Sequence, residues 1–253
     1  MLTTILRRFR RPAGPEAERE PVVAGEPAGE EDFRKLRVGF TAAVSHELRT
    51  PLARLLALLD SADLPDADLR ELIVRAREEV ERMSELVDDV LFLSEVETGH
   101  EVVSLQGTQL LPVLEEVAAA SRERAERAGI TIAVVASPDV LVPLRPRLLR
   151  TVVENLVENV FRHARGATRC TLGGRREGGL VLLSVSDNGV GIAEDELPRV
   201  FERFYRGDAS RSSRGSGLGL AIVKHVVTAA GGDVEARRGP GGLGVEIRCT
   251  FRS

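Results

Sequence analysis

The chain has 253 residues, of which 43% are hydrophobic and 29% are charged, and this balance excludes a chain that is disordered throughout. Its 35 Lys and Arg residues against 39 Asp and Glu residues give a net charge of −4, so we expect no nucleic-acid partner. No window approaches the about 18 consecutive apolar residues of a membrane-spanning helix, and we expect a cytoplasmic protein. The two cysteines, Cys170 and Cys249, lack the spacing of a metal site or of a disulfide framework.

Residues 1–32 differ from the rest of the chain in composition. A short apolar start and four arginines between positions 7 and 11 precede a stretch rich in Pro, Gly, Ala and Glu without apolar periodicity. This composition predicts a disordered leader. The alternative for its basic start is a stub that rests on an anionic membrane surface. We expect membrane contact only through this stub, or where the chain is part of a longer receptor.

Residues 33–99 have the pattern of two long amphipathic helices. The seam positions from Val38 to Leu59, and again from Leu69 to Val90, follow one another in steps of three and four. The stretch SADLPDAD between the two runs has the composition of a turn. Further leucines beside each seam widen the apolar stripe beyond what one partner helix covers. We therefore expect a helical hairpin that closes into a four-helix bundle in a homodimer.

Residues 100–253 alternate between strand and helix patterns. We predict strands at EVVSLQ, ITIAVV and VLVPL, a hairpin of TRCTLGG and LVLLSVSD, and two final strands around RGPGGLG. Helices are expected at residues 112–128, 145–165 and 218–230, with a short one at 194–203. This order predicts one mixed sheet covered by helices, an α/β sandwich that follows the hairpin as a second domain.

Two glycine-containing stretches carry the first chemical signal. DNGVGI at 187–192 follows a predicted strand, and GSGLGLAIV at 215–223 opens a predicted helix. Glycines there let backbone N–H groups approach a ligand, and a helix N-terminus favours phosphate. Asp187 stands where its carboxylate accepts a hydrogen bond from an exocyclic amine such as that of adenine. The alternative, when each stretch is considered alone, is that DNGVGI is only a tight turn after a strand and that GSGLGLAIV is only the start of a helix.

The predicted helix at 145–165 adds candidate ligands for a cation. Asn155 and Asn159 lie four residues apart and share one face. Amide oxygens suit Mg²⁺, which binds together with nucleotide phosphates. Arg162 and His163 follow about one turn later, where they meet phosphate. The alternative is that the two asparagines face solvent.

Five motifs together resemble a known family. SHELRTPLA at 45–53, ENLVEN at 154–159, DNGVGI, FERFYR at 201–206 and GSGLGLAI occur in the order and approximate spacing of the conserved boxes of sensor histidine kinases. The resemblance implies a dimerisation and phosphotransfer hairpin, followed by a catalytic domain of the Bergerat ATP-binding fold. It implies ATP-dependent autophosphorylation and phosphotransfer to an aspartate of a response-regulator receiver domain, with regulator phosphatase activity as a further expectation.

The resemblance also assigns roles to residues. His46 matches the phosphoacceptor, Glu47 the acid beside it and Thr50 the residue linked to regulator dephosphorylation. Asn159 matches the Mg²⁺ ligand, and Asp187 the residue that reads adenine. The other residues expected to bind the nucleotide are Asn155, Arg162, His163, Gly189, Gly191, Arg214, Gly215, Gly217, Leu218 and Gly219.

A mobile lid is expected at residues 206–214, a small, polar segment without periodicity between two glycines. Two other functions stay open. A degenerate kinase would act as a scaffold, and an ATPase of the gyrase and Hsp90 group would release free phosphate. In that group the general base is a Glu where this chain has Asn155.

Overall fold

The computed structural model describes residues 28–64, 68–97, 102–207 and 215–252. Contacts divide the chain into two compact units, Met1–Gly39 and Phe40–Ser253. Most of the expected leader lies outside the described residues. The first helix begins at Ala28 and not near Phe33, so residues 28–32 belong to that helix. None of the described helices is both long and apolar enough to cross a membrane.

Two long helices form the predicted hairpin. Helix α1 runs from Ala28 to Ala62 and α2 from Leu69 to Glu97. Helix α2 begins at a side-chain cap, because Asp68 Oδ1 accepts the backbone N–H groups of Arg70 and Glu71 at 3.0 and 3.2 Å. The two predicted helical runs are therefore confirmed.

The apolar seam of the hairpin is only partly covered by this chain. Leu86, Leu93 and Val96 of α2 are buried. Other seam positions are largely open to solvent, with Ile73 67% exposed and Leu59 56% exposed. The remaining exposed members of this surface are Leu52, Leu56, Leu69, Val80, Val87 and Leu91. An exposed apolar strip of this kind on a helix marks a surface for a partner.

A five-stranded mixed sheet forms the second part of the fold, in the order β2-β4-β5-β7-β6. Its strands are β2 (Thr131–Ala136), β4 (Arg169–Glu177), β5 (Leu180–Asp187), β6 (Asp233–Arg238) and β7 (Val245–Arg252). Strand β2 pairs in parallel with β4, and the other neighbours are antiparallel. The two hairpins expected from the alternating runs, β4–β5 and β6–β7, are confirmed.

The expectation of a single sheet was wrong. Strands β1 (Val103–Gln109) and β3 (Leu141–Leu144) pair antiparallel with each other in a separate two-stranded sheet. Pro143 lies within β3, and a proline has no N–H for a ladder on both sides. The short strand is therefore unsuited to the centre of the large sheet.

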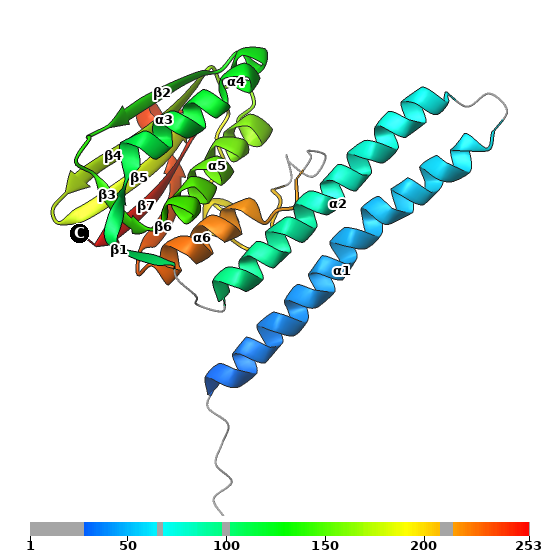
Figure 1. The fold of residues 1–253 in the computed structure, drawn as a ribbon, viewed down its shortest axis with the longest axis horizontal. Coiled ribbons are helices and arrows are strands. Elements are labelled where there is room, and N and C mark those ends of the chain that lie inside the picture. The colour runs from blue at the N-terminus through cyan, green and yellow to red at the C-terminus, as the bar shows by residue number, and fades with distance from the viewer. Residues whose placement is uncertain (1–27, 65–67, 98–101, 208–214, 253) are drawn as a thin grey trace, which may run out of the picture. The chain divides into compact units, whose positions relative to one another are not determined.

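Helices cover one face of the large sheet (Figure 1). They are α3 (Leu110–Ala120), α5 (Pro146–His163) and α6 (Gly219–Ala229), with α4 (Arg122–Ala128) after α3. The single helix expected at 112–128 is thus two helices. Its apolar face ends at Val117, and only Ala125 is buried in α4, so nothing holds the chain in one straight helix past Ser121. Gly129 ends α4 in the left-handed conformation, which is common for glycine at the end of a helix.

The helix expected at 194–203 was also wrong. The structure has only a short 3₁₀ segment, Leu197–Arg199, among turns. Pro198 lacks an N–H to donate and disfavours helical geometry at the preceding residue. The chain here consequently follows i to i+3 hydrogen bonds, such as Arg199 N–H to Glu196 O at 2.9 Å.

Candidate nucleotide and phosphotransfer site

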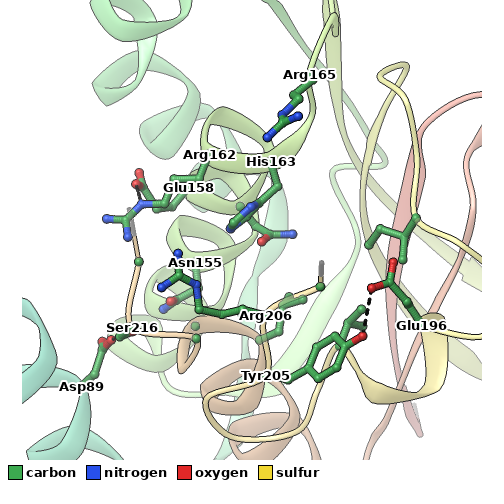
Figure 2. Close-up of a pocket in the computed structure, with 18 of the residues that line it drawn as sticks. Asp89, Asn155, Glu158, Arg162, His163, Arg165, Glu196, Tyr205, Arg206 and Ser216 are labelled. Atoms are coloured by element: carbon green, nitrogen blue, oxygen red, sulfur yellow. Dashed lines mark hydrogen bonds and ion pairs between the residues drawn. The ribbon is translucent and has the colours of Figure 1, made fainter. Parts of the chain in front are cut away.

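A cavity of about 710 Å³ opens beside α5, a size typical of a small-molecule site (Figure 2). Residues from several parts of the sequence line it. They include Asn155, Asn159, Arg162 and His163 of α5, residues 190–193 after β5, Tyr205–Gly207, residues 215–217, 219 and 220 at the entry to α6, and three acids of α2. The cavity therefore brings together the glycine stretches and the asparagines that the sequence singled out.

Helix α5 presents its polar face to this cavity because its apolar face is fixed in the core. Six of its residues are buried, from Leu149 to Val160. The Asn155 amide donates to Thr151 O at 2.9 Å. The Asn159 amide has no partner among the described residues, and it lines both this cavity and a smaller one beside it. Its oxygen is thus available to a cation.

The donor set at this point fits Mg²⁺ rather than a metal held by protein alone. Among the described residues no group of three or more His, Cys, Asp or Glu side chains could hold a metal ion. Mg²⁺ commonly takes one or two protein oxygens and completes its shell with phosphate oxygens and water. Asn159, next to a cavity large enough for a nucleotide, matches that requirement.

Asp187 ends β5 and lines the smaller cavity together with Asn159 and Ile192. Its Oδ1 accepts the Gly189 N–H at 2.8 Å. Burial raises the pKa of Asp187 above its ordinary value, and hydrogen bonds from the Gly189 and Val245 backbones partly offset this. A half-buried carboxylate held by the backbone is a fixed acceptor for a ligand.

Gly244 is a part of this site that sequence reasoning missed. It lies at φ +64°, and a Cβ there would sit 2.1 Å from Asp187 O and 2.5 Å from Asp187 Oδ1. Only glycine lets the turn before β7 press against the end of β5. The glycine-rich turn RGPGGLG was a signal for a special backbone conformation here, but nothing in the sequence showed that this turn contacts Asp187, 57 residues earlier.

The glycines of the second stretch permit close approaches. A Cβ on Gly219 would lie 2.8 Å from Asn155 Oδ1, and one on Gly217 would lie 2.9 Å from the Phe204 backbone. Phe204 N–H donates to Gly217 O at 2.9 Å, so the chain before residue 208 is tied to the chain after residue 214. Phe204 has φ +62°, which is uncommon for a residue with a side chain.

The segment between these ties, residues 208–214, lies outside the described residues. The expected contact of Arg214 and most of the expected lid belong to it. Before it, the Tyr205 hydroxyl hydrogen-bonds to Glu196 Oε1 at 3.1 Å, and the Arg199 guanidinium lies 4.6 Å from the Tyr205 ring centre. Arg206 extends across the cavity toward α5 (Figure 2). Tyr205 is thus held in place just before the segment.

Besides Asp187, which lines only the smaller cavity, two predicted binding residues lie beside the larger cavity rather than in its lining. Gly189 contributes its N–H to Asp187. The Leu218 side chain is fully buried in the core, and its N–H donates to Ser216 Oγ at 3.2 Å. The other predicted residues, Gly191, Gly215, Gly217 and Gly219 of the glycine stretches, line the cavity.

Charged groups surround the phosphate-sized end of the cavity. Burial, together with the nearby Arg162 and Arg206, lowers the pKa of His163. Arg162 pairs with Glu158 on its own helix and, at 3.1 Å, with Glu85 of α2. Arg162 and Arg206 bring guanidinium donors to the cavity, which Glu158 and the acids of α2 also line, and guanidinium groups of this kind can bind phosphate oxygens.

Helix α2 supplies a second contact that the sequence did not indicate. Ser216 Oγ donates to Asp89 Oδ2 at 2.7 Å (Figure 2). Burial raises the pKa of Asp89, and the hydrogen bond from Ser216 lowers it in part. A residue of the second glycine stretch is thereby joined to the hairpin.

His46 lies on α1 and its side chain is 76% exposed. Its Nδ1 lies 3.7 Å from Glu47 Oε1, which leaves Nε2 open to solvent. The Thr50 hydroxyl lies 3.5 Å from the His46 carbonyl oxygen, one turn back along the helix. These three residues are not part of the cavity lining.

Comparison with known proteins supports both parts of the fold. Residues 36–99 match the His Kinase A (phospho-acceptor) domain, and residues 145–253 match the histidine kinase-, DNA gyrase B- and HSP90-like ATPases. The sensor-like histidine kinase SenX3 of Mycolicibacterium smegmatis is 34% identical over 211 residues, 81% of this chain and 55% of that one. The histidine-protein kinase BaeS of Escherichia coli K12 is 34% identical over 223 residues, 86% of this chain and 47% of that one.

Solved structures agree. The histidine kinase AdeS of Acinetobacter baumannii superimposes with a TM-score of 0.64 at 25% identity, over 82% of this chain and 97% of that one. ShkA, solved in complex with AMPPNP, gives a TM-score of 0.59 at 27% identity, over 87% of this chain and 45% of that one. The chain spans about half the length of the curated relatives it matches. With the phosphoacceptor and ATPase domains in this order, the chain belongs to the sensor histidine kinases of two-component systems.

Proposed function

We propose that this chain is an ATP-dependent protein-histidine kinase that phosphorylates His46 and then passes the phosphoryl group to an aspartate of a response-regulator receiver domain. The observation that carries the proposal is the cavity beside α5, where Asn155, Asn159 and Arg162 face the glycine-rich entry to α6. The exposed imidazole of His46 on a separate helix supplies the acceptor.

Each end of ATP has a suitable partner in this site. Asp187 lies at the smaller cavity, of about 30 Å³, which shares Asn159 and His163 with the larger one; its fixed carboxylate accepts the exocyclic amine of an adenine whose ring extends from the larger cavity. Arg162 and Arg206 donate to the phosphates in the larger one. Asn159 holds Mg²⁺, which neutralises charge on the phosphates when it is bound.

The chemical step is an in-line displacement at the γ-phosphorus. His46 Nε2 forms the new N–P bond while the bond to the bridging oxygen breaks and ADP leaves. Glu47 lies on the Nδ1 side of the ring, where its carboxylate favours the positive charge that develops on the imidazole. In the second step a receiver-domain carboxylate displaces His46 from phosphorus.

The chain acts as a homodimer in this proposal. The exposed strip on α1 and α2, from Leu52 to Leu91, is the surface that a second hairpin covers. Packing two hairpins into a four-helix bundle removes this apolar surface from water. Regulator dephosphorylation that depends on Thr50, next to His46 on the same face of α1, is part of the same proposal.

Labelling with γ-³²P-ATP and Mg²⁺ tests the proposal. We expect acid-labile label on the wild-type protein, transfer of that label to a cognate receiver domain, and no label on Asn159→Ala. His225→Gln is the control, since His225 lies on α6 outside the cavity lining. Release of free phosphate without labelled protein would support an ATPase instead, and nucleotide binding without either product would support a scaffold.

A further inference from the structure

Glu158 is the centre of a chain of charged groups that runs from α4 to the cavity. Its carboxylate accepts two hydrogen bonds from the Arg124 guanidinium, one of them at 3.0 Å from Nη2 to Oε1. The same Oε1 accepts the Nε–H of Arg162. Arg124 is itself anchored, because its guanidinium lies 4.8 Å from the centre of the Phe161 ring.

This arrangement fixes one side of the Arg162 guanidinium and leaves the other side for a ligand. Glu158 binds Nε and not the terminal nitrogens. Nη1 points at the second glycine stretch, where a Cβ on Gly215 would lie 3.1 Å from it. Nη2 donates to Glu85 Oε2 of α2 at 3.1 Å, and since the Glu85 side chain is 56% exposed, a phosphate would take its place at Nη2.

The Glu158 carboxylate lies between two guanidinium groups, those of Arg124 and Arg162, and hydrogen-bonds to both. With Glu158 removed, the nearest carboxylates left to Arg162 are on α2, at Glu85 and the neighbouring Asp88 and Asp89 that line the cavity. The guanidinium would then turn toward the hairpin and away from the phosphates.

We propose that Glu158, braced by Arg124, is a positioning residue that holds Arg162 in the orientation that binds the nucleotide phosphates. The inference rests on the proposed function, in which Arg162 is a phosphate ligand. It assigns to the acidic residue before Asn159 a role in binding an anion, although its own charge repels that anion.

The sign of one substitution separates positioning from simple electrostatics. Glu158→Gln removes a negative charge near the phosphates, so electrostatics alone predicts tighter binding of ATP. The Gln oxygen can still accept the Arg162 Nε–H, but the ion pair is lost and an NH₂ group faces the Arg124 guanidinium. A guanidinium that is held less firmly predicts weaker binding, by up to about tenfold, the size expected for one charge-assisted hydrogen bond. We expect the weaker binding.

The test measures the affinities of the full-length chain for Mg²⁺-ATP and, by competition, for adenosine. Glu158→Gln is expected to weaken ATP binding and to leave adenosine binding unchanged, because adenosine has no phosphate. The matched control is Glu116→Gln, which breaks the ion pair of Glu116 with Arg150, a residue of the same helix α5 outside the cavity. This control is expected to change neither affinity.

Three results would overturn the inference. They are unchanged or tighter ATP binding by Glu158→Gln, an equal loss of ATP and adenosine binding, or an equal loss in the Glu116→Gln control. Arg162→Gln distinguishes the inference from the proposed function. If Arg162→Gln weakens ATP binding and Glu158→Gln does not, only the positioning role fails. If Arg162→Gln has no effect, the phosphate contact assigned to Arg162 fails as well.

Discussion

Replacing Asp187 with Asn tests how the base of the nucleotide is recognised. The amide has the shape of the carboxylate, and its oxygen can still accept the Gly189 N–H that Asp187 Oδ1 accepts at 2.8 Å. The second position then carries an NH₂ group where the carboxylate offered an acceptor. An exocyclic amine of adenine is also a donor, so two donors would face each other.

The expected loss follows from the hydrogen bond that is removed. A hydrogen bond to a charged group contributes about 1.5–3 kcal/mol, which corresponds to a factor of about 10 to 150 in the dissociation constant for ATP. The fold should not be weakened at neutral pH. Burial raises the pKa of Asp187, so the ionised carboxylate is itself costly in the folded state, and a neutral amide avoids this cost.

Isothermal titration with Mg²⁺-ATP, together with urea unfolding, measures both quantities. The control is Asp233→Asn, which makes the same charge change at an exposed position at the start of β6. We expect weaker ATP binding and an undiminished free energy of unfolding for Asp187→Asn alone. ATP binding within threefold of the wild type, in a variant that is fully folded, would refute the assigned role of Asp187.

Further predictions concern the glycine stretch, the contact with α2 and the response to pH. Gly217 and Gly166 have the same left-handed backbone conformation, but only at Gly217 would an added Cβ lie 2.9 Å from other backbone atoms, those of Phe204. Urea unfolding should therefore show a loss of about 1 kcal/mol in the free energy of unfolding for Gly166→Ala and a clearly larger loss for Gly217→Ala. Ser216→Ala removes the hydrogen bond that lowers the pKa of Asp89, so carboxyl NMR titration should show this pKa rising further. Burial, and then nearby arginines, lower the pKa of His163 in the folded state below the ordinary value of 6.5. The contribution of neutral His163 to stability is therefore present above pH 6.5 and is lost as the pH falls from 6.5 toward the folded-state pKa. Over this range the free energy of unfolding should fall less in His163→Asn than in the wild type.

Local patterns in the sequence were sufficient for most elements and for much of the site. The apolar period of α5 determines which residues are buried, and the polar face that remains must carry Asn155 and Asn159 toward the cavity. The helical phase around Ser45 likewise leaves His46 exposed. Both conclusions need only one element and its own periodicity.

Other features depend on contacts between residues far apart in the chain, and periodicity has no access to them. Gly244 is required by Asp187, and Glu158 acts with Arg124 of another helix. The contact between Ser216 and Asp89 spans 127 residues. The helix expected at 194–203 is absent for a local reason, since Pro198 lies in the middle of this range.

The most direct measurement of the central claim is the position of the phosphoryl group on the protein after incubation with Mg²⁺-ATP. The chain has four histidines, at positions 46, 100, 163 and 225. Mass spectrometry under neutral conditions, which preserve a phosphoramidate, should find the added group on His46 alone, and His46→Gln should carry none. Phosphate on another residue of the wild type, or full labelling of His46→Gln, would contradict the account.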